Sequence, residues 1–202
     1  MVKVTLSKRI SEVKRKSLET DIVLKINLDG KGSSHLQLEV PFLRHMLDSF
    51  ARHGFFDLEI KAVGDVEIDD HHTVEDIGIC LGMAVKEALQ DKRGITRYGS
   101  VILPMDESLV RVAMDCSGRG QLIYKTNFEQ EKVGLFEVNL VEEFFKAFSY
   151  HAGITLHINV LYGKNTHHTI EGIFKAFGRT LDMACRIENR RIDIPSAKGI
   201  ID

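Results

Sequence analysis

His71-His72-Thr73-Val74-Glu75 and His167-His168-Thr169-Ile170-Glu171 are two copies of one short pattern, 96 positions apart in a chain of 202 residues. Each copy leads into an apolar run with helical spacing. One such copy would be typical of a helix cap or a solvated helix face, but two matched copies predict a duplicated fold. That fold would bring together four imidazoles and two carboxylates, a ligand set for transition metals.

Helical geometry separates the two histidines within each copy. Residues three or four apart share one face of an α-helix, whereas neighbours diverge by about 100°. His71 and His72 therefore both lie near Glu75 but point in different directions, which suits two ions better than one. We expect two metal sites, each drawing on both halves of the chain or on two subunits.

The repeat extends well beyond the motif. Residues 71–89 match 167–185 at the offset of 96, and residues 50–60 match 148–158 at an offset of 98. The change of offset requires only a two-residue difference in loop length. Because no linker separates the halves, we expect residues 1–92 and 93–190 to be two structural repeats that share one compact unit, followed by a tail at 191–202.

Hydrophobic periodicity predicts the same order of elements in each half. Turns at 29–32 and 117–120 are expected to join neighbouring strands, and a further strand is expected within 3–16. The fold class is therefore α+β, with the helices of each half packed on one face of a mixed sheet. The expected strands are 20–28, 36–40, 57–66, 109–115, 121–126 and 155–161, and the expected helices are 41–53, 74–90, 141–152 and 169–186.

Composition excludes several classes of protein. The chain is 44% hydrophobic and 28% charged, as in ordinary soluble globular proteins, and its formal net charge of −2 provides no basic field to attract nucleic acid. It contains neither an apolar run of membrane-spanning length nor a secretory signal pattern. Three cysteines without Cys-x-x-Cys spacing indicate buried thiols in a reducing compartment, so a cytoplasmic location is expected.

The offset of 98 also relates one residue in the first helix of the first half to one residue in the first helix of the second half. His45 corresponds to Glu143, and both side chains can coordinate a metal ion. Taken alone, His45 would be typical of a core histidine and Glu143 of a solvated helix face. Their symmetric placement favours a ligand role for both.

Several motifs in the same order resemble the imidazoleglycerol-phosphate dehydratase family, and the resemblance covers essentially the whole chain. The resemblance implies removal of water from imidazole-glycerol phosphate to give imidazole-acetol phosphate in histidine biosynthesis. It also implies two Mn²⁺ ions per active site that bind the substrate as imidazolate, and a 24-subunit homo-oligomer built from trimers. The motifs are Phe42-Leu43-Arg44-His45-Met46-Leu47, Asp69-Asp70-His71-His72, Gly163-Lys164-Asn165-Thr166-His167-His168, Phe174-Lys175-Ala176-Phe177 and Pro195-Ser196-Ala197-Lys198-Gly199.

Residue by residue, the resemblance implies a set of metal ligands and acid–base groups. Glu171 is the expected proton-abstracting base, with Glu75 as the alternative and Glu19 as a further catalytic group. The family often has His at the position of Glu143, so this chain departs from the pattern there, although a carboxylate also coordinates Mn²⁺. The implied ligands are His45, His71, His72, Glu75, Glu143, His167, His168 and Glu171.

The resemblance also implies residues that hold the substrate. Glu19 and His53 are expected to contact it, and Asp106 is a further candidate for that role. The phosphate is a dianion, which proteins hold by charge-assisted hydrogen bonds from cations and hydroxyl groups. The implied phosphate-binding set is Arg97, Arg119, Lys175, Ser196 and Lys198, the last two from the C-terminal tail.

Three other functions remain open from the sequence. A zinc hydrolase would need two histidines at i and i+4, which neither motif provides. A metal-storage or structural metal protein would have no use for Arg97, Arg119 and Lys175. A nucleic-acid-binding module is common among small α+β folds, but the charge balance argues against it.

Overall fold

Both halves of the chain fold into three strands, a helix, a strand and a helix, in that order. The structure is a computed structural model that describes residues 8–201. The first half contains β1 (Ile10–Lys16), β2 (Thr20–Asn27), β3 (Ser34–Gln37), α1 (Pro41–Gly54), β4 (Asp57–Gly64) and α2 (His71–Leu89). The second contains β5 (Tyr98–Met105), β6 (Ser108–Asp115), β7 (Gln121–Lys125), α3 (Leu140–Ala152), β10 (Thr155–Tyr162) and α4 (Thr166–Cys185), with a short hairpin of β8 (Lys132–Val133) and β9 (Phe136–Glu137) before α3.

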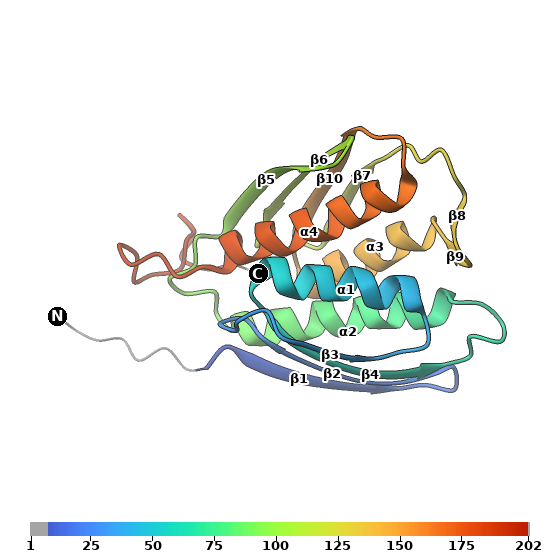
Figure 1. The fold of residues 1–202 in the computed structure, drawn as a ribbon. Coiled ribbons are helices and arrows are strands. Elements are labelled where there is room, and N and C mark those ends of the chain that lie inside the picture. Colours follow the sequence, from blue (N-terminus) through green and yellow to red (C-terminus); the bar gives the residue numbers. More distant parts are fainter. Residues whose placement is uncertain (1–7, 202) are drawn as a thin grey trace.

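The two main sheets have equivalent strand orders, β1-β2-β4-β3 and β5-β6-β10-β7. In each sheet two strand pairs are antiparallel and one is parallel, so both sheets are mixed. The four helices lie between the sheets, α1 and α2 above the first and α3 and α4 below the second (Figure 1). The predicted α+β class, with helices on one face of a mixed sheet in each half, is confirmed.

The predicted hairpins around 29–32 and 117–120 are wrong. In the first sheet β4 lies between β2 and β3, and in the second β10 lies between β6 and β7. The carboxylate of Asp57, at the start of β4, accepts hydrogen bonds from the backbone N–H groups of Lys31 (2.9 Å) and Ser33 (3.2 Å). The 29–33 loop is therefore tied to β4 instead of closing a tight turn, and β3 pairs with β4 in parallel.

Parallel helix pairs form the centre of the molecule. α1 packs along α4 and α2 packs along α3, with Phe50 and Phe177 stacked at 4.9 Å between ring centroids. A Cβ atom on Gly178 would lie 2.4 Å from the carbonyl oxygen of Phe50, and one on Gly82 would lie 2.7 Å from that of Phe148. These two glycines, which correspond in the repeat, are therefore required where the helices cross.

Several details of the elements differ from the sequence expectation. α2 and α4 begin three residues earlier than expected, so both His-His pairs lie in the first helical turn. β5 and the β8–β9 hairpin were not predicted, and the part of the expected 3–16 strand that precedes residue 8 lies outside the described residues. Cys80, Cys116 and Cys185 are free and buried, as predicted.

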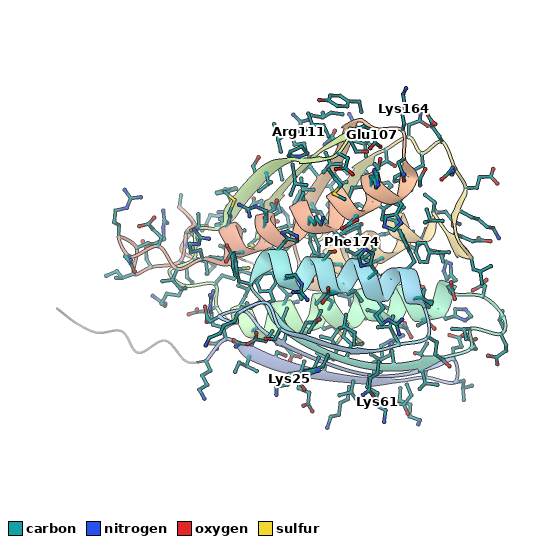
Figure 2. All side chains as sticks on the ribbon, in the orientation of Figure 1. Lys25, Lys61, Glu107, Arg111, Lys164 and Phe174 are labelled. Carbon is teal, nitrogen blue, oxygen red and sulfur yellow. The ribbon has the colours of Figure 1, made fainter. Side chains whose placement is uncertain are left out.

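The outer faces of the sheets are exposed. Lys25 and Lys61 project outward from the first sheet, whereas Phe174 lies in the interior between the helices (Figure 2). Within residues 8–201, no helix combines the length and the apolar character needed to cross a membrane.

Candidate functional site

The parallel packing of α1 and α4 brings together His45, His167 and Glu171. Oε2 of Glu171 lies 3.9 Å from Nε2 of His45 and 3.6 Å from Nε2 of His167. One potential ligand atom from each residue lies within 4.8 Å of the others. Within residues 8–201, this is the only group of three or more such side chains that meets that distance. Two imidazole nitrogens and a carboxylate oxygen form a suitable partial ligand set for a transition-metal ion.

Glu171 is held ionised at this position. Its side chain is only 12% exposed, and burial alone would raise the pKa of the carboxyl group. The ammonium group of Lys175 donates to Oε1 at 2.7 Å, and the charges of Lys175, His45 and His167 bring the net pKa below its ordinary value. Lys175 therefore keeps the Glu171 carboxylate ionised.

The corresponding residues of the other helix pair are less closely gathered. On α2, Nε2 of His71 lies 3.7 Å from Oε2 of Glu75. Glu143 on α3 contacts Lys146 at 3.4 Å and does not complete a group of three within the described residues. His71 and Glu75 therefore lie close to each other on α2, while Glu143 contacts a neighbouring lysine.

The second histidine of each motif is oriented by a carboxylate that sequence reasoning missed. Nδ1 of His72 lies 3.0 Å from Asp65, in the β4–α2 loop, and Nδ1 of His168 lies 2.9 Å from Glu107, in the β5–β6 turn. These contacts raise the pKa of both histidines, and the hydrogen bond with His168 lowers the pKa of Glu107 to about 2. Metal-binding histidines commonly donate their second ring N–H to a carboxylate in this way, which leaves Nε2 for the ion.

Asp65 and Glu107 carried no signal in the sequence because they arise from different loops of the two halves. Asp65 precedes the helix that carries His72, and Glu107 lies 61 positions before His168, so only the fold brings each pair together. Glu19 and Asp106, which were predicted, lie in corresponding strand turns. Oε1 of Glu19 is 3.8 Å from Nε2 of His72, and Oδ2 of Asp106 is 3.7 Å from Nδ1 of His168.

Most of the predicted phosphate-binding residues gather at the opposite end of the second sheet. Arg97 forms a bidentate ion pair with Asp115, at 2.7 and 3.1 Å. It also donates to the carbonyl oxygen of Pro195 at 2.7 Å, and this bond attaches the C-terminal tail. In that tail the N–H of Lys198 donates to Oγ of Ser196. The carbonyl of Arg119 accepts from Thr155, which pairs with Asp115 across the strands.

Lys175 lies apart from this group. Its ammonium group is 3.4 Å from the sulfur of Met105, at the far end of β5 from Arg97. At about 3.3 Å per residue, the eight-residue strand separates the two ends by on the order of 20 Å. One chain therefore brings Lys175 to the His45–His167–Glu171 group but keeps Arg97, Arg119 and the tail away from it.

His53, near the end of α1, lines a groove with Lys175 and Arg179. Partial burial lowers the pKa of the His53 imidazole, and the positive charges of Lys175 and Arg179 lower it further. Arg179 was not among the residues predicted from the sequence.

Comparison with known proteins points to one family. Residues 39–181 match the family described as imidazoleglycerol-phosphate dehydratase. A relative of that name from Acetivibrio thermocellus is 56% identical over 190 residues, which cover 94% of this chain and 97% of the relative. Another from Hydrogenovibrio crunogenus is 56% identical over 194 residues, covering 96% of this chain and all of the relative.

Two solved structures share the fold. The imidazoleglycerol-phosphate dehydratase of Staphylococcus aureus superposes with a TM-score of 0.81 at 43% identity, covering 89% of this chain and 99% of that protein. The enzyme from Pyrococcus furiosus, solved in complex with (S)-C348, gives a TM-score of 0.81 at 34% identity and covers 93% of this chain and 99% of that protein. The resemblance drawn from the motifs is thereby confirmed, and the chain belongs to the imidazoleglycerol-phosphate dehydratase family of hydro-lyases.

Proposed function

We propose that this protein removes water from imidazole-glycerol phosphate to give imidazole-acetol phosphate in histidine biosynthesis, with two Mn²⁺ ions per active site. The observation that carries the proposal is the juxtaposition of His45, His167 and Glu171 by two parallel helices, in a chain of the dehydratase family. A cytoplasmic location follows from a biosynthetic role and from cysteines kept as buried thiols.

The donor atoms fit such ions. His45, His167 and Glu171 would hold one ion, and His71, Glu75 and Glu143 would contribute to the other. His72 and His168 would complete the coordination through Nε2, because their Nδ1 atoms face Asp65 and Glu107. Bound Mn²⁺ would act as a Lewis acid on the substrate imidazole and would orient it.

Side chains of this protein would transfer the protons in the reaction. One C–H and one C–OH bond must break, so that water leaves and the resulting enol becomes a ketone. Glu171, kept ionised beside Lys175, is the base for the carbon-bound proton, with Glu75 as the alternative. Glu19, half-exposed and 3.8 Å from His72, would act on the departing hydroxyl group.

Within a single chain the substrate cannot reach every predicted contact. Arg97, Arg119, Ser196 and Lys198 lie at the far end of β5 from Glu171, on the order of 20 Å away, whereas only a three-carbon chain joins the substrate's ring to its phosphate. We infer that another copy supplies these residues and that the protein is a homo-oligomer, for which the family resemblance implies 24 subunits. On this view residues 1–92 and 93–190 are the repeats, and the 191–202 tail serves a neighbour's site.

A subunit-mixing assay tests the shared site. Arg97→Ala and Glu171→Gln should each be inactive alone. The two variants are then dissociated, mixed in equal amounts and reassembled. If two copies share each site, the mixture should regain about a quarter of the active sites of the wild type. Each variant reassembled with itself is the matched control. Mixtures that stay as inactive as the separate variants would contradict the shared site.

Turnover itself tests the reaction. Purified protein with Mn²⁺ should convert imidazole-glycerol phosphate to a product that carries a ketone, and Glu171→Gln should not. Octahedral Mn²⁺, in place of tetrahedral Zn²⁺, would separate this proposal from a zinc hydrolase.

A further inference from the structure

A cationic groove runs beside α4, next to the His45–His167–Glu171 group. It is formed by His53, Lys175, Arg179 and residues 100–105 of β5, and it has a volume of about 590 Å³. Among residues 8–201, β5 is an edge strand that pairs only with β6, so its other edge carries unpaired backbone N–H groups, except at Pro104, which has none. The groove therefore combines basic side chains with free backbone donors.

The charge of this groove is unbalanced. None of the described residues that line it carries a carboxylate. Lys175 is already paired with Glu171, whereas Arg179 is exposed and has no ion-pair partner among residues 8–201. Two cations at positions i and i+4 of a helix repel each other and destabilise it. Helix stability therefore does not explain why Lys175 and Arg179 are both basic, whereas a bound anion would explain it.

The internal repeat provides a comparison. At the offset of 96, Lys175 and Arg179 correspond to Ile79 and Met83 of α2. The two helices have equivalent positions in the fold, yet the first half carries no cation at either place. Packing of the helix into the fold does not require basic residues here, so they mark a specialised use of the second half.

The spacing along α4 relates the groove to the metal-ligand group. Glu171, Lys175 and Arg179 follow one another at intervals of four residues, so their side chains project from one face about 6 Å apart. A ligand whose imidazole lies beside Glu171 would extend its chain past Lys175 towards Arg179.

We propose that Arg179 is a phosphate-binding residue, which with Lys175 and the free edge of β5 holds the phosphate group of the substrate at the α4 side. This inference rests on the proposed function, and it adds a residue to the set implied by the family resemblance. Arg97 and Arg119 of another copy would contact the opposite side of the same phosphate. A planar guanidinium that has no ion-pair partner in the described part of the chain suits this role, because it can donate two parallel hydrogen bonds.

The test compares Arg179→Gln with wild type in the assembled enzyme. Loss of a charge-assisted hydrogen bond predicts a rise in KM for imidazole-glycerol phosphate of roughly 10- to 100-fold, with kcat within about threefold. Inhibition by inorganic phosphate should weaken by a similar factor. Turnover of imidazole-glycerol, which lacks the phosphate, should have the same kcat/KM in both proteins. Arg179→Lys should recover part of the loss, and Lys86→Gln, at an exposed lysine of α2, is the matched control.

An assembled Arg179→Gln enzyme with unchanged KM and unchanged phosphate inhibition would overturn the inference while leaving the dehydratase activity established. If wild type shows no turnover, the proposed function fails instead. The groove is then tested by calorimetric titration with inorganic phosphate, in which equal affinity of wild type and variant overturns it. If Arg179→Gln does not assemble, Arg179→Met, which also removes the charge, takes its place, and an unchanged KM in that variant is the contradicting result.

Discussion

Oε2 of Glu107 lies 2.9 Å from Nδ1 of His168. In the other half Asp65 makes the equivalent contact with His72 at 3.0 Å. The two carboxylates come from different loops, one before a helix and one between two strands, so the repeats have reached the same arrangement by different routes. Both contacts fix the imidazole so that Nε2 is left for a ligand.

Removing Glu107 should therefore weaken metal binding without removing a ligand. Glu107→Ala is expected to raise the dissociation constant for Mn²⁺ by about 10- to 100-fold, because the His168 ring loses its orientation and the support of a negative charge. Titration of metal-free protein with Mn²⁺, followed by electron paramagnetic resonance, measures this constant. Glu129→Ala, at an exposed glutamate, is the control, and equal affinity in both variants would show that Glu107 has no such role.

Glu143 is the one implied ligand at a position where the family resemblance leads us to expect His. If it coordinates an ion, Glu143→Ala should lower the metal content, whereas Glu143→His should retain it. Elemental analysis of the purified oligomer gives the number of ions per chain. Full metal content in Glu143→Ala would mean that Glu143 serves only as the partner of Lys146, which it contacts at 3.4 Å.

The crossing of α1 and α4 should tolerate no side chain at Gly178. In Gly178→Ala the new Cβ would lie 2.4 Å from the carbonyl oxygen of Phe50, so the helices must separate. We expect the free energy of unfolding to fall by about 1–3 kcal/mol, measured by denaturant titration.

Gly172 on the same helix is the matched control. Its added Cβ would meet Met105 and Val110 at 3.4 Å or more, which is ordinary contact. Gly172→Ala should leave stability unchanged or raise it by up to about 1 kcal/mol, since Ala is the better helix former. Equal losses in both variants would show that the close approach at Gly178 is not the cause.

Asp57 should contribute to stability in a pH-dependent way. Hydrogen bonds from the backbone N–H of Lys31, and then of Ser33, lower the pKa of this carboxyl group. Because the folded pKa lies below the unfolded value of about 3.9, the contribution is complete above that pH and is lost as the pH falls through the folded pKa. Wild type should thus be more stable than Asp57→Asn at pH 7, and the difference should shrink below about pH 4. A difference that is constant from pH 7 to pH 3 would contradict this account.

The sequence predicted the repeated order of elements because hydrophobic periodicity and the two offsets are local signals. It did not predict that β4 and β10 lie in the middle of their sheets, since strand neighbours depend on long-range pairing that no local pattern specifies. The same limit explains why only some of the site residues could be predicted from the sequence. His45, His167 and Glu171 follow from motifs, whereas Asp65, Glu107 and Arg179 have no motif and are recognised only when the fold brings them to their partners.

The separation of the phosphate-binding residues also became visible only in three dimensions. Arg97 and Lys175 belong to one implied set, yet they lie at opposite ends of β5. Sequence spacing contains no information on which copy of the chain completes a site.

Turnover of imidazole-glycerol phosphate by metal-free protein, to which Mn²⁺ is added stepwise, tests whether the protein is a metal-dependent dehydratase. Activity should be absent after chelation, rise with added Mn²⁺ and reach a plateau near two ions per chain, with imidazole-acetol phosphate as the product. Absence of turnover at every Mn²⁺ concentration, or full turnover in the presence of the chelator, would contradict a metal-dependent dehydratase built on His45, His167 and Glu171.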